Sequence, residues 1–230
     1  MKKTLISALV LSLFLFAVGC GKKVEDDATK ESTQTEAKAQ VVADIAPNPA
    51  DSLAGKTFPI RSNDNTIVTI ETDFGKMTIE LYRDVAPAHA DSFKARTKDG
   101  FYNGLIFHRI IDGFMIQGGD PKGNGSGNAG YYLAEEFNEL PHQDGTLSMA
   151  RSQSPNSASC QFFICLSRSR STAGLDRQYT VFGQVIKGYN VLHAIGSLEV
   201  TPNARGEKSV PVEEVVMRKV YLSDVNGNAL

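Results

Sequence analysis

Alternating apolar and polar residues constrain the fold of this chain more than any other feature of its sequence. The segment TIVTIET (residues 66–72) alternates with a period of two, and GKMTIELY (75–82) follows across a break at Asp73 and Phe74. Successive side chains of an extended chain point to opposite faces, so this period predicts half-buried β-strands. The short break between the two segments predicts a β-hairpin.

The same composition recurs along the rest of the chain. Six further segments predict strands, at residues 105–111, 115–117, 145–149, 161–166, 180–186 and 212–221. Helices are predicted at only two places, APAHADSFKARTKDG (86–100), where Pro87 suits a first helical turn, and GYNVLHAIG (188–196). Many short strands with only two helices favour a closed or nearly closed antiparallel barrel. The lack of regular strand–helix alternation disfavours a doubly wound parallel sheet.

The first residues predict a secretory signal. Two lysines precede an apolar run at 5–18, which is shorter than the ~20 residues that a spanning helix needs. Small residues then lead to Gly19 and Cys20, an ending similar to the lipobox of bacterial lipoproteins, in which the cysteine is lipidated. We therefore assign residues 1–19 to a lipoprotein signal peptide and Cys20 to lipidation. The alternative is a plain secretory signal with an incidental cysteine.

Three parts follow the signal. Residues 20–59 are rich in small and charged residues with few large apolar ones, so they predict a lipidated, flexible tether. Residues 60–223 carry the strand pattern and predict one folded domain, and residues 224–230 predict a C-terminal tail. These parts together predict an extracytoplasmic lipoprotein anchored in a membrane. Gly21 lacks the aspartate that favours inner-membrane retention, so we expect the outer membrane, or the outer face of the cell membrane where a cell has only one.

Charge and motif content argue against several functions. Loss of the signal leaves 22 basic residues (24 − 2) against 26 acidic ones, without a long basic run, so we expect no nucleic-acid partner. The four histidines are scattered and C-x-x-C is absent from the sequence, so we expect no metal site and no cofactor. The motif GSGNAG (125–130) lacks the context of a dinucleotide site and predicts a permissive loop. Cys160 and Cys165 would lie about 17 Å apart in a strand, so we predict two free thiols.

Four blocks along the chain resemble the signatures of the cyclophilins, the peptidyl-prolyl cis-trans isomerases. They are FHRIIDGFMIQGGD (107–120), GTLSMA (145–150), QFFIC (161–165) and LDRQYTVFGQV (175–185), in the family's order and at workable spacings. The resemblance covers about residues 60–222. It implies a mainly β fold, an eight-stranded antiparallel closed barrel capped by two α-helices, with a proline-binding groove on the outside of the barrel.

The resemblance also implies which residues form the site. By motif position, Arg109 matches the family's catalytic arginine. The implied substrate-binding residues are Phe114, Met115, Gln117, Phe163 and Leu175 around the proline, Gln161 in the groove, Ala150 and Arg151, whose backbone anchors the peptide, and Tyr179 in place of a histidine at the pocket floor. Gly174 stands where the family has an aromatic residue, after a stretch that is longer than usual. Loss of that aromatic donor implies weak cyclosporin binding.

The turn after Arg109 decides which residues share its face. A two-residue loop at 112–113 would place Arg109 opposite Ile116, whereas a three-residue loop at 112–114 would pair it with Gln117. The implied mechanism needs the arginine and the glutamine on one face, so we predict the three-residue loop. Likewise, Gln161 and Phe163 should face the groove while Phe162 and Ile164 fill the barrel.

These features predict a peptidyl-prolyl cis-trans isomerase that acts on X–Pro bonds of unfolded exported proteins, through non-covalent stabilisation of a twisted amide. The alternative is a proline-peptide-binding chaperone module with little turnover. A third hypothesis is a surface ligand for an external partner, which would need a large exposed apolar patch away from the groove. We expect the protein to be monomeric.

Overall fold

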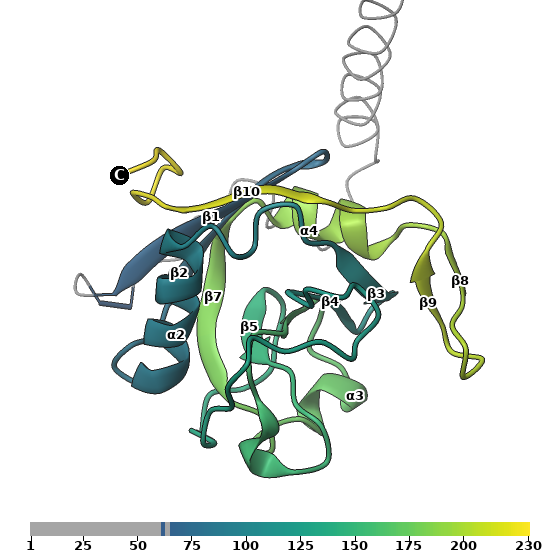
Figure 1. The fold of residues 1–230 in the computed structure, drawn as a ribbon, viewed down its shortest axis with the longest axis horizontal. Helices are drawn as coiled ribbons and strands as arrows, with labels where there is room; N and C mark the ends of the chain where they lie inside the picture. Colours follow the sequence, from purple (N-terminus) through teal and green to yellow (C-terminus); the bar gives the residue numbers. More distant parts are fainter. Residues whose placement is uncertain (1–60, 63–64) are drawn as a thin grey trace, which may run out of the picture. The chain divides into compact units, whose positions relative to one another are not determined.

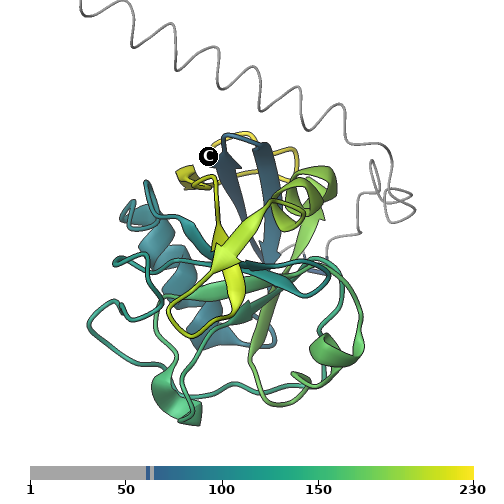
Figure 2. The same ribbon diagram turned by 90° about the vertical axis from the view of Figure 1, so that its right-hand side faces the viewer.

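The computed structural model describes residues 61–62 and 65–230 (Figures 1 and 2). The predicted signal peptide (1–19), the lipidation site Cys20 and the predicted tether (20–59) lie outside the described residues. The predicted C-terminal tail is described, and it turns back along the last strand. Its backbone forms a bridge between Ser223 and Ala229, and the Leu230 N–H donates to the Leu222 carbonyl at 3.1 Å.

Most of the described chain is β-structure. The strands are β1 (Thr66–Thr72), β2 (Gly75–Leu81), β3 (Phe107–Ile111), β4 (Met115–Gly118), β5 (Thr146–Met149), β6 (Phe162–Cys165), β7 (Val181–Lys187), β8 (Val200–Pro202), β9 (Lys208–Pro211) and β10 (Met217–Leu222). The helices are α2 (Pro87–Lys98), α3 (Arg170–Ala173), α4 (Tyr189–Gly196) and the 3-10 turn η2 (Pro155–Ser157). The hairpin predicted from TIVTIET and GKMTIELY is confirmed as β1 and β2.

The main sheet has eight antiparallel strands in the order β10-β1-β2-β7-β5-β6-β4-β3. Its two edges, β3 and β10, do not form a paired ladder. They meet through one isolated bridge, Ile106 to Val216, flanked by backbone hydrogen bonds from Phe107 to Val215 and from Met217 to Leu105. The mainly β, eight-stranded antiparallel prediction is therefore confirmed, but the sheet is open and curled, and the prediction of a closed barrel is wrong.

The open edge has a physical reason. The last strand was predicted to begin at Val212, but residues 212–216 form no continuous strand and β10 begins only at Met217. The outer side of β3 is occupied instead by the separate β8–β9 hairpin, with β9 packed against β3 (Figures 1 and 2). The sequence did not indicate this hairpin, because its strands are short and largely exposed and each ends in a proline, Pro202 or Pro211.

Both predicted helices are present. α2 packs against β1, β7 and β10, and α4 packs against β2, β3 and β4. The start of α2 has no side-chain cap of its own, since its N-cap residue is Ala86. The Glu136 carboxylate, from a distant loop, accepts hydrogen bonds from the backbone N–H groups of Ala88 and His89, both at 3.0 Å. A negative group at this position also complements the helix dipole.

An aromatic cluster fills the space inside the curled sheet. The Phe162 ring packs edge-on against Phe93, Tyr102 and Phe107, with centroid distances of 5.2, 5.7 and 6.0 Å. Phe162 and Ile164 are fully buried in this core, as predicted from the alternation of β6. Phe163, between them, belongs to a separate cluster on the other face of the strand. The period of two thus divides β6 between the core and a second, outward-facing site.

Replacing Phe162 by alanine should destabilise the fold by about 3–5 kcal/mol, because the core cannot collapse around the lost ring. Phe163→Ala is the matched control, and it should cost clearly less since its ring borders an open cavity that water can enter. Denaturant unfolding of both variants measures the difference. A loss at Phe162 no larger than that at Phe163 would contradict this account of the core.

Candidate functional site

A shallow cavity lies on the outer face of β3, β4 and β6. Its volume is about 150 Å³, and its lining residues are Arg109, Phe114, Met115, Gln117, Ala150, Arg151, Phe163, Leu175 and Tyr179. All the residues predicted for the groove except Gln161 therefore surround one cavity. Gln161 lines the adjacent cavity described below.

The β3–β4 register places the polar residues at this cavity. Arg109 pairs with Gln117, and Ile110 pairs with Ile116, so the predicted three-residue loop is confirmed. Ile110 and Ile116 are fully buried in the core. Gln117 pairs in turn with Phe163 on β6. Arginine, glutamine and phenylalanine thus lie side by side on one face of three neighbouring strands.

Apolar side chains form the floor and walls of the cavity. Met115 and Phe163 are buried, and Phe114, Leu175 and Tyr179 pack against them. The rings of Phe163 and Tyr179 meet edge-to-face at a centroid distance of 5.8 Å. This geometry favours a small apolar ring as the occupant.

The Phe163 ring rests on a fixed histidine. His142 stacks against it at 5.9 Å and is held through Nε2 by the Ser148 hydroxyl at 2.9 Å and through Nδ1 by Asp176 at 3.1 Å. Burial lowers the pKa of His142 despite the nearby Asp176 carboxylate. Arg168 hydrogen-bonds both oxygens of Asp176 and holds the pKa of that carboxyl well below its usual range.

Arg151 holds the opposite wall. Its guanidinium lies 4.5 Å from the centre of the Tyr179 ring and donates two hydrogen bonds to the Gln178 carbonyl, at 3.0 and 2.9 Å. The sequence reading assigned only a backbone role to Arg151, and this side-chain contact was missed. An arginine can stack on a ring and bond a carbonyl at once, so Arg151 fixes the Tyr179 ring at the cavity.

The helix α3 accounts for the long stretch before Leu175. Ser169 and Thr172 form a capping box at its start, and Gly174 closes its end. Gly174 therefore ends α3 directly before Leu175, which lines the cavity, and it carries no aromatic side chain.

Arg109 does not point freely to solvent. Its Nε and NH2 groups donate to the two carboxylate oxygens of Glu207, both at 2.8 Å. Its NH1 group lies 3.3 Å from the Gln117 side-chain oxygen and 3.6 Å from the Met115 sulfur. The acid nearest in sequence, Asp112, is not its partner. Glu207 lies 98 positions away and reaches Arg109 through the missed β8–β9 hairpin, which is why no local signal indicated it.

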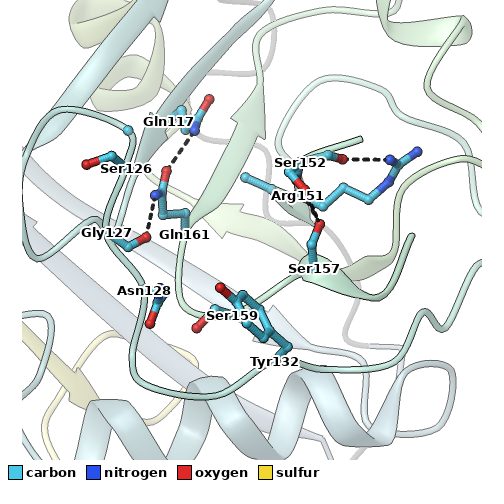
Figure 3. Close-up of a pocket in the computed structure, with 12 residues that line it drawn as sticks. Gln117, Ser126, Gly127, Asn128, Tyr132, Arg151, Ser152, Ser157, Ser159 and Gln161 are labelled. Carbon is cyan, nitrogen blue, oxygen red and sulfur yellow. Dashed lines mark hydrogen bonds between the residues drawn. The ribbon is translucent and has the colours of Figure 1, made fainter. Parts of the chain in front are cut away.

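A line of amides continues from Arg109 into a second cavity of about 350 Å³. The Gln117 amide donates to Gln161 at 3.0 Å, and the Gln161 amide donates to the Gly127 carbonyl at 2.8 Å. Figure 3 shows Gln161 between Gln117 and Gly127, with Arg151 on the other side of this cavity. An extended peptide crossing both cavities would meet backbone and amide groups along its length.

The glycine-rich loop is built around a buried carboxylate. Asp120 accepts hydrogen bonds from the backbone N–H groups of Lys122, Asn124 and Gly125. Burial by itself would raise the pKa of Asp120, but these backbone donors outweigh it and the pKa is lowered. Gly125 has a φ of 85°, so the loop needs the conformational freedom predicted for GSGNAG.

Cys160 and Cys165 are both buried and free, as predicted. Among residues 61–62 and 65–230, no group of three or more His, Cys, Asp or Glu side chains could hold a metal ion. None of the helices in that same part of the chain combines the length and apolar character needed to cross a membrane.

Comparison with known proteins identifies the class of domain to which this curled antiparallel sheet, with an apolar cavity and an ordered arginine on its outer face, belongs. The family model for cyclophilin type peptidyl-prolyl cis-trans isomerases matches residues 67–221. A peptidyl-prolyl cis-trans isomerase of Acinetobacter baylyi is 38% identical over 182 residues, covering 76% of this chain and 94% of that protein. The human peptidyl-prolyl cis-trans isomerase-like 1 is 38% identical over 162 residues, covering 68% and 92%.

Solved structures agree. The crystal structure of a Cryptosporidium parvum cyclophilin type isomerase in the presence of the dipeptide Ala-Pro superimposes with a TM-score of 0.61 at 33% identity, covering 69% of this chain and 99% of that one. The chain therefore belongs to the cyclophilin-type peptidyl-prolyl cis-trans isomerases, enzymes that isomerise the peptide bond before proline.

We expect the Glu207 carboxyl to titrate near pH 2, because hydrogen bonds from Arg109 lower its pKa to about 2. In Arg109→Ala the pKa should return towards the ordinary value of about 4.3. Since the folded-state pKa is depressed, the stabilisation by this pair is complete above the unfolded pKa and is lost as the pH falls through about 2. Carbon-13 NMR tests this prediction: between pH 7 and 2.5 the wild-type carboxyl signal should stay mostly that of the ionised form, and a wild-type midpoint near 4.3 would contradict the pairing.

Proposed function

We propose that this protein isomerises X–Pro bonds in unfolded exported proteins, by non-covalent catalysis at Arg109. The observation that carries the proposal is the position of the Arg109 guanidinium, at the rim of an apolar cavity bounded by Phe163 and Met115. The Ala-Pro dipeptide present with the Cryptosporidium parvum relative supports a proline ligand for this cavity.

The reaction needs no nucleophile and no proton transfer. Rotation about a peptide bond costs about 18–20 kcal/mol, because the nitrogen lone pair is delocalised into the carbonyl. Uncatalysed X–Pro bonds therefore isomerise over roughly tens to hundreds of seconds. In the transition state the amide is twisted, the nitrogen is pyramidal and its lone pair is localised. A site that binds this state better than the planar amide accelerates the reaction.

The cavity supplies the two things that such a site needs. Met115, Phe163 and their apolar neighbours grip the proline ring and leave the preceding bond free to turn. The Arg109 guanidinium stays protonated and donates without acting as an acid. Its NH1 group faces the cavity through the contacts to Gln117 and Met115, so it can donate to the nitrogen lone pair as that pair becomes localised.

A proline-peptide-binding module on the same scaffold is the second candidate. The departures from the family pattern at Gly174 and Tyr179 favour it, since Tyr179 lines the cavity and Gly174 lies directly before Leu175, which also lines it. Turnover separates the two functions: a binding module would hold an Ala-Pro peptide without accelerating its isomerisation.

We further propose that the domain is displayed outside the cytoplasm by a lipid on Cys20. This proposal rests on the sequence, where a short apolar run and small residues precede the cysteine. An acyl anchor is needed because the mature chain, at −4 (22 − 26), would not be attracted to an anionic membrane surface.

Replacing Arg109 by alanine should lower kcat/KM by about 10²–10³-fold, the usual effect of removing one transition-state donor. Direct NMR exchange spectroscopy on an Ala-Pro peptide measures the rate without a coupled protease. Arg83→Ala is the matched control, because Arg83 is also ion-paired, to Asp91, but lines none of the cavities described above. The proposal would be refuted if the wild-type protein did not accelerate isomerisation of the peptide, or if Arg109→Ala kept the wild-type turnover.

Replacing Cys20 by serine should abolish lipid attachment, because serine lacks the thiol that would carry the lipid. Labelling with radioactive palmitate and fractionation of cells into membrane and soluble parts measure this. The variant should be unlabelled and soluble outside the cytoplasm, with unchanged isomerase activity. Labelling or membrane attachment that survives in Cys20→Ser would overturn the assignment.

A further inference from the structure

We propose that Glu207 is a positioning residue for catalysis, which fixes the Arg109 guanidinium with its NH1 group towards the proline cavity. The inference rests on the proposed role of Arg109 and adds to it a residue outside the signature blocks. Three features of the structure carry it: the geometry of the ion pair, the support of Glu207 itself, and the space into which Arg109 could otherwise turn.

The ion pair uses one edge of the guanidinium. Two parallel hydrogen bonds of 2.8 Å join the Nε and NH2 groups of Arg109 to the two oxygens of Glu207. A bidentate pair of this kind fixes direction as well as distance. The remaining group, NH1, has only longer contacts, 3.3 Å to Gln117 and 3.6 Å to Met115. The strong bonds thus lie on the edge away from the cavity, and the weakly bonded group is the one that a substrate can reach.

Glu207 is itself held in a hydrogen-bonded turn between β8 and β9. The Asn203 side-chain oxygen accepts from the backbone N–H groups of Arg205 and Glu207, at 2.8 and 3.1 Å. Its amide donates to the Glu207 carboxylate at 3.3 Å. Gly206 adopts a φ of 82°, which the turn requires. The carboxylate therefore sits on a defined support, although its side chain is 39% exposed.

Without Glu207, the Arg109 side chain would have free space to rotate into. A third cavity of about 850 Å³ lies between β3 and the β8–β9 turn, and both Arg109 and Glu207 line it. Arginine has a long side chain with large rotamer freedom, and this one is 29% exposed. Loss of the carboxylate would let the guanidinium turn into this space, away from the proline.

The Glu207 carboxylate also has an effect that opposes catalysis. A carboxylate beside the guanidinium partly offsets its charge, which by itself would weaken the donor. The group to be stabilised, however, is the lone pair of a neutral nitrogen, so the direction of the N–H matters more than the net charge of the pair. A displacement of about 1 Å at a reacting centre can cost roughly 10²-fold in rate. We therefore expect positioning to outweigh charge.

The test compares Glu207→Gln and Glu207→Ala with wild type. Each should lower kcat/KM for an Ala-Pro peptide by about tenfold, less than the loss from removing Arg109, because a displaced donor still reaches the substrate part of the time. The loss should fall on kcat, with the peptide Kd within about twofold of wild type, because the apolar grip is intact. The Arg109 Nε–H NMR signal should lose its protection from solvent exchange.

Glu199→Gln is the matched control. Glu199 lies at the base of the same hairpin and is exposed, and within the described residues its carboxylate forms no hydrogen bond or ion pair. This variant should retain wild-type kcat and Kd. If Glu199→Gln lost as much kcat as Glu207→Gln, the effect would come from the general loss of negative charge, and the inference would be overturned.

A double-mutant cycle makes the result specific. If Glu207 acts only through Arg109, then Glu207→Gln should have no further effect on turnover in an Arg109→Ala background. Additive losses, a rise in Kd at unchanged kcat, or increased activity of Glu207→Gln would each overturn the inference. Absence of turnover in wild type would instead refute the proposed function, so the two failures are distinguishable.

Discussion

The pairing of Arg109 with Gln117 is the constraint on which the rest of the site depends. Because side chains alternate along a strand, a slip of one residue in the β3–β4 register would exchange the two faces of the hairpin. Either Ile110 would leave the core and Arg109 would enter it, or Ile116 would leave the core and Gln117 would enter it. The burial of two isoleucines therefore enforces the same register that the proposed catalysis at Arg109 needs. Stability and function do not compete here, because one pattern of alternation satisfies both.

On the outer face of the sheet, polar contacts hold the walls of the shallow cavity in place. Phe163 is held from below by His142, which Ser148 and Asp176 fix through both ring nitrogens. Tyr179 is held from the side by the Arg151 guanidinium. Each apolar wall is thus supported by a polar group that has its own hydrogen-bond partners. These supports reduce the number of conformations that a proline ring would have to select on binding.

The sequence predicts most of this structure wherever local patterns decide it. The alternation in β1, β2 and β6, Pro87 at the start of α2, and the division of Phe162 and Phe163 between two faces could all be read from a few neighbouring residues. The family resemblance supplied the residues of the groove. Neither source could supply Glu207 or the open edge of the sheet, because both depend on the weakly patterned β8–β9 hairpin and on contacts across about a hundred positions.

The use of arginine rather than lysine follows from the same geometry. A half-buried cation needs a counter-charge, yet a catalytic donor must remain available to its substrate. A lysine ammonium is a compact point charge, and a carboxylate that bound it would draw the whole charge away from the cavity. The planar guanidinium separates the two tasks, since one edge binds Glu207 while NH1 stays at the cavity. A lysine at this position could also neutralise Glu207. Only the planar guanidinium can pair with the carboxylate and still present a second N–H donor in a fixed direction.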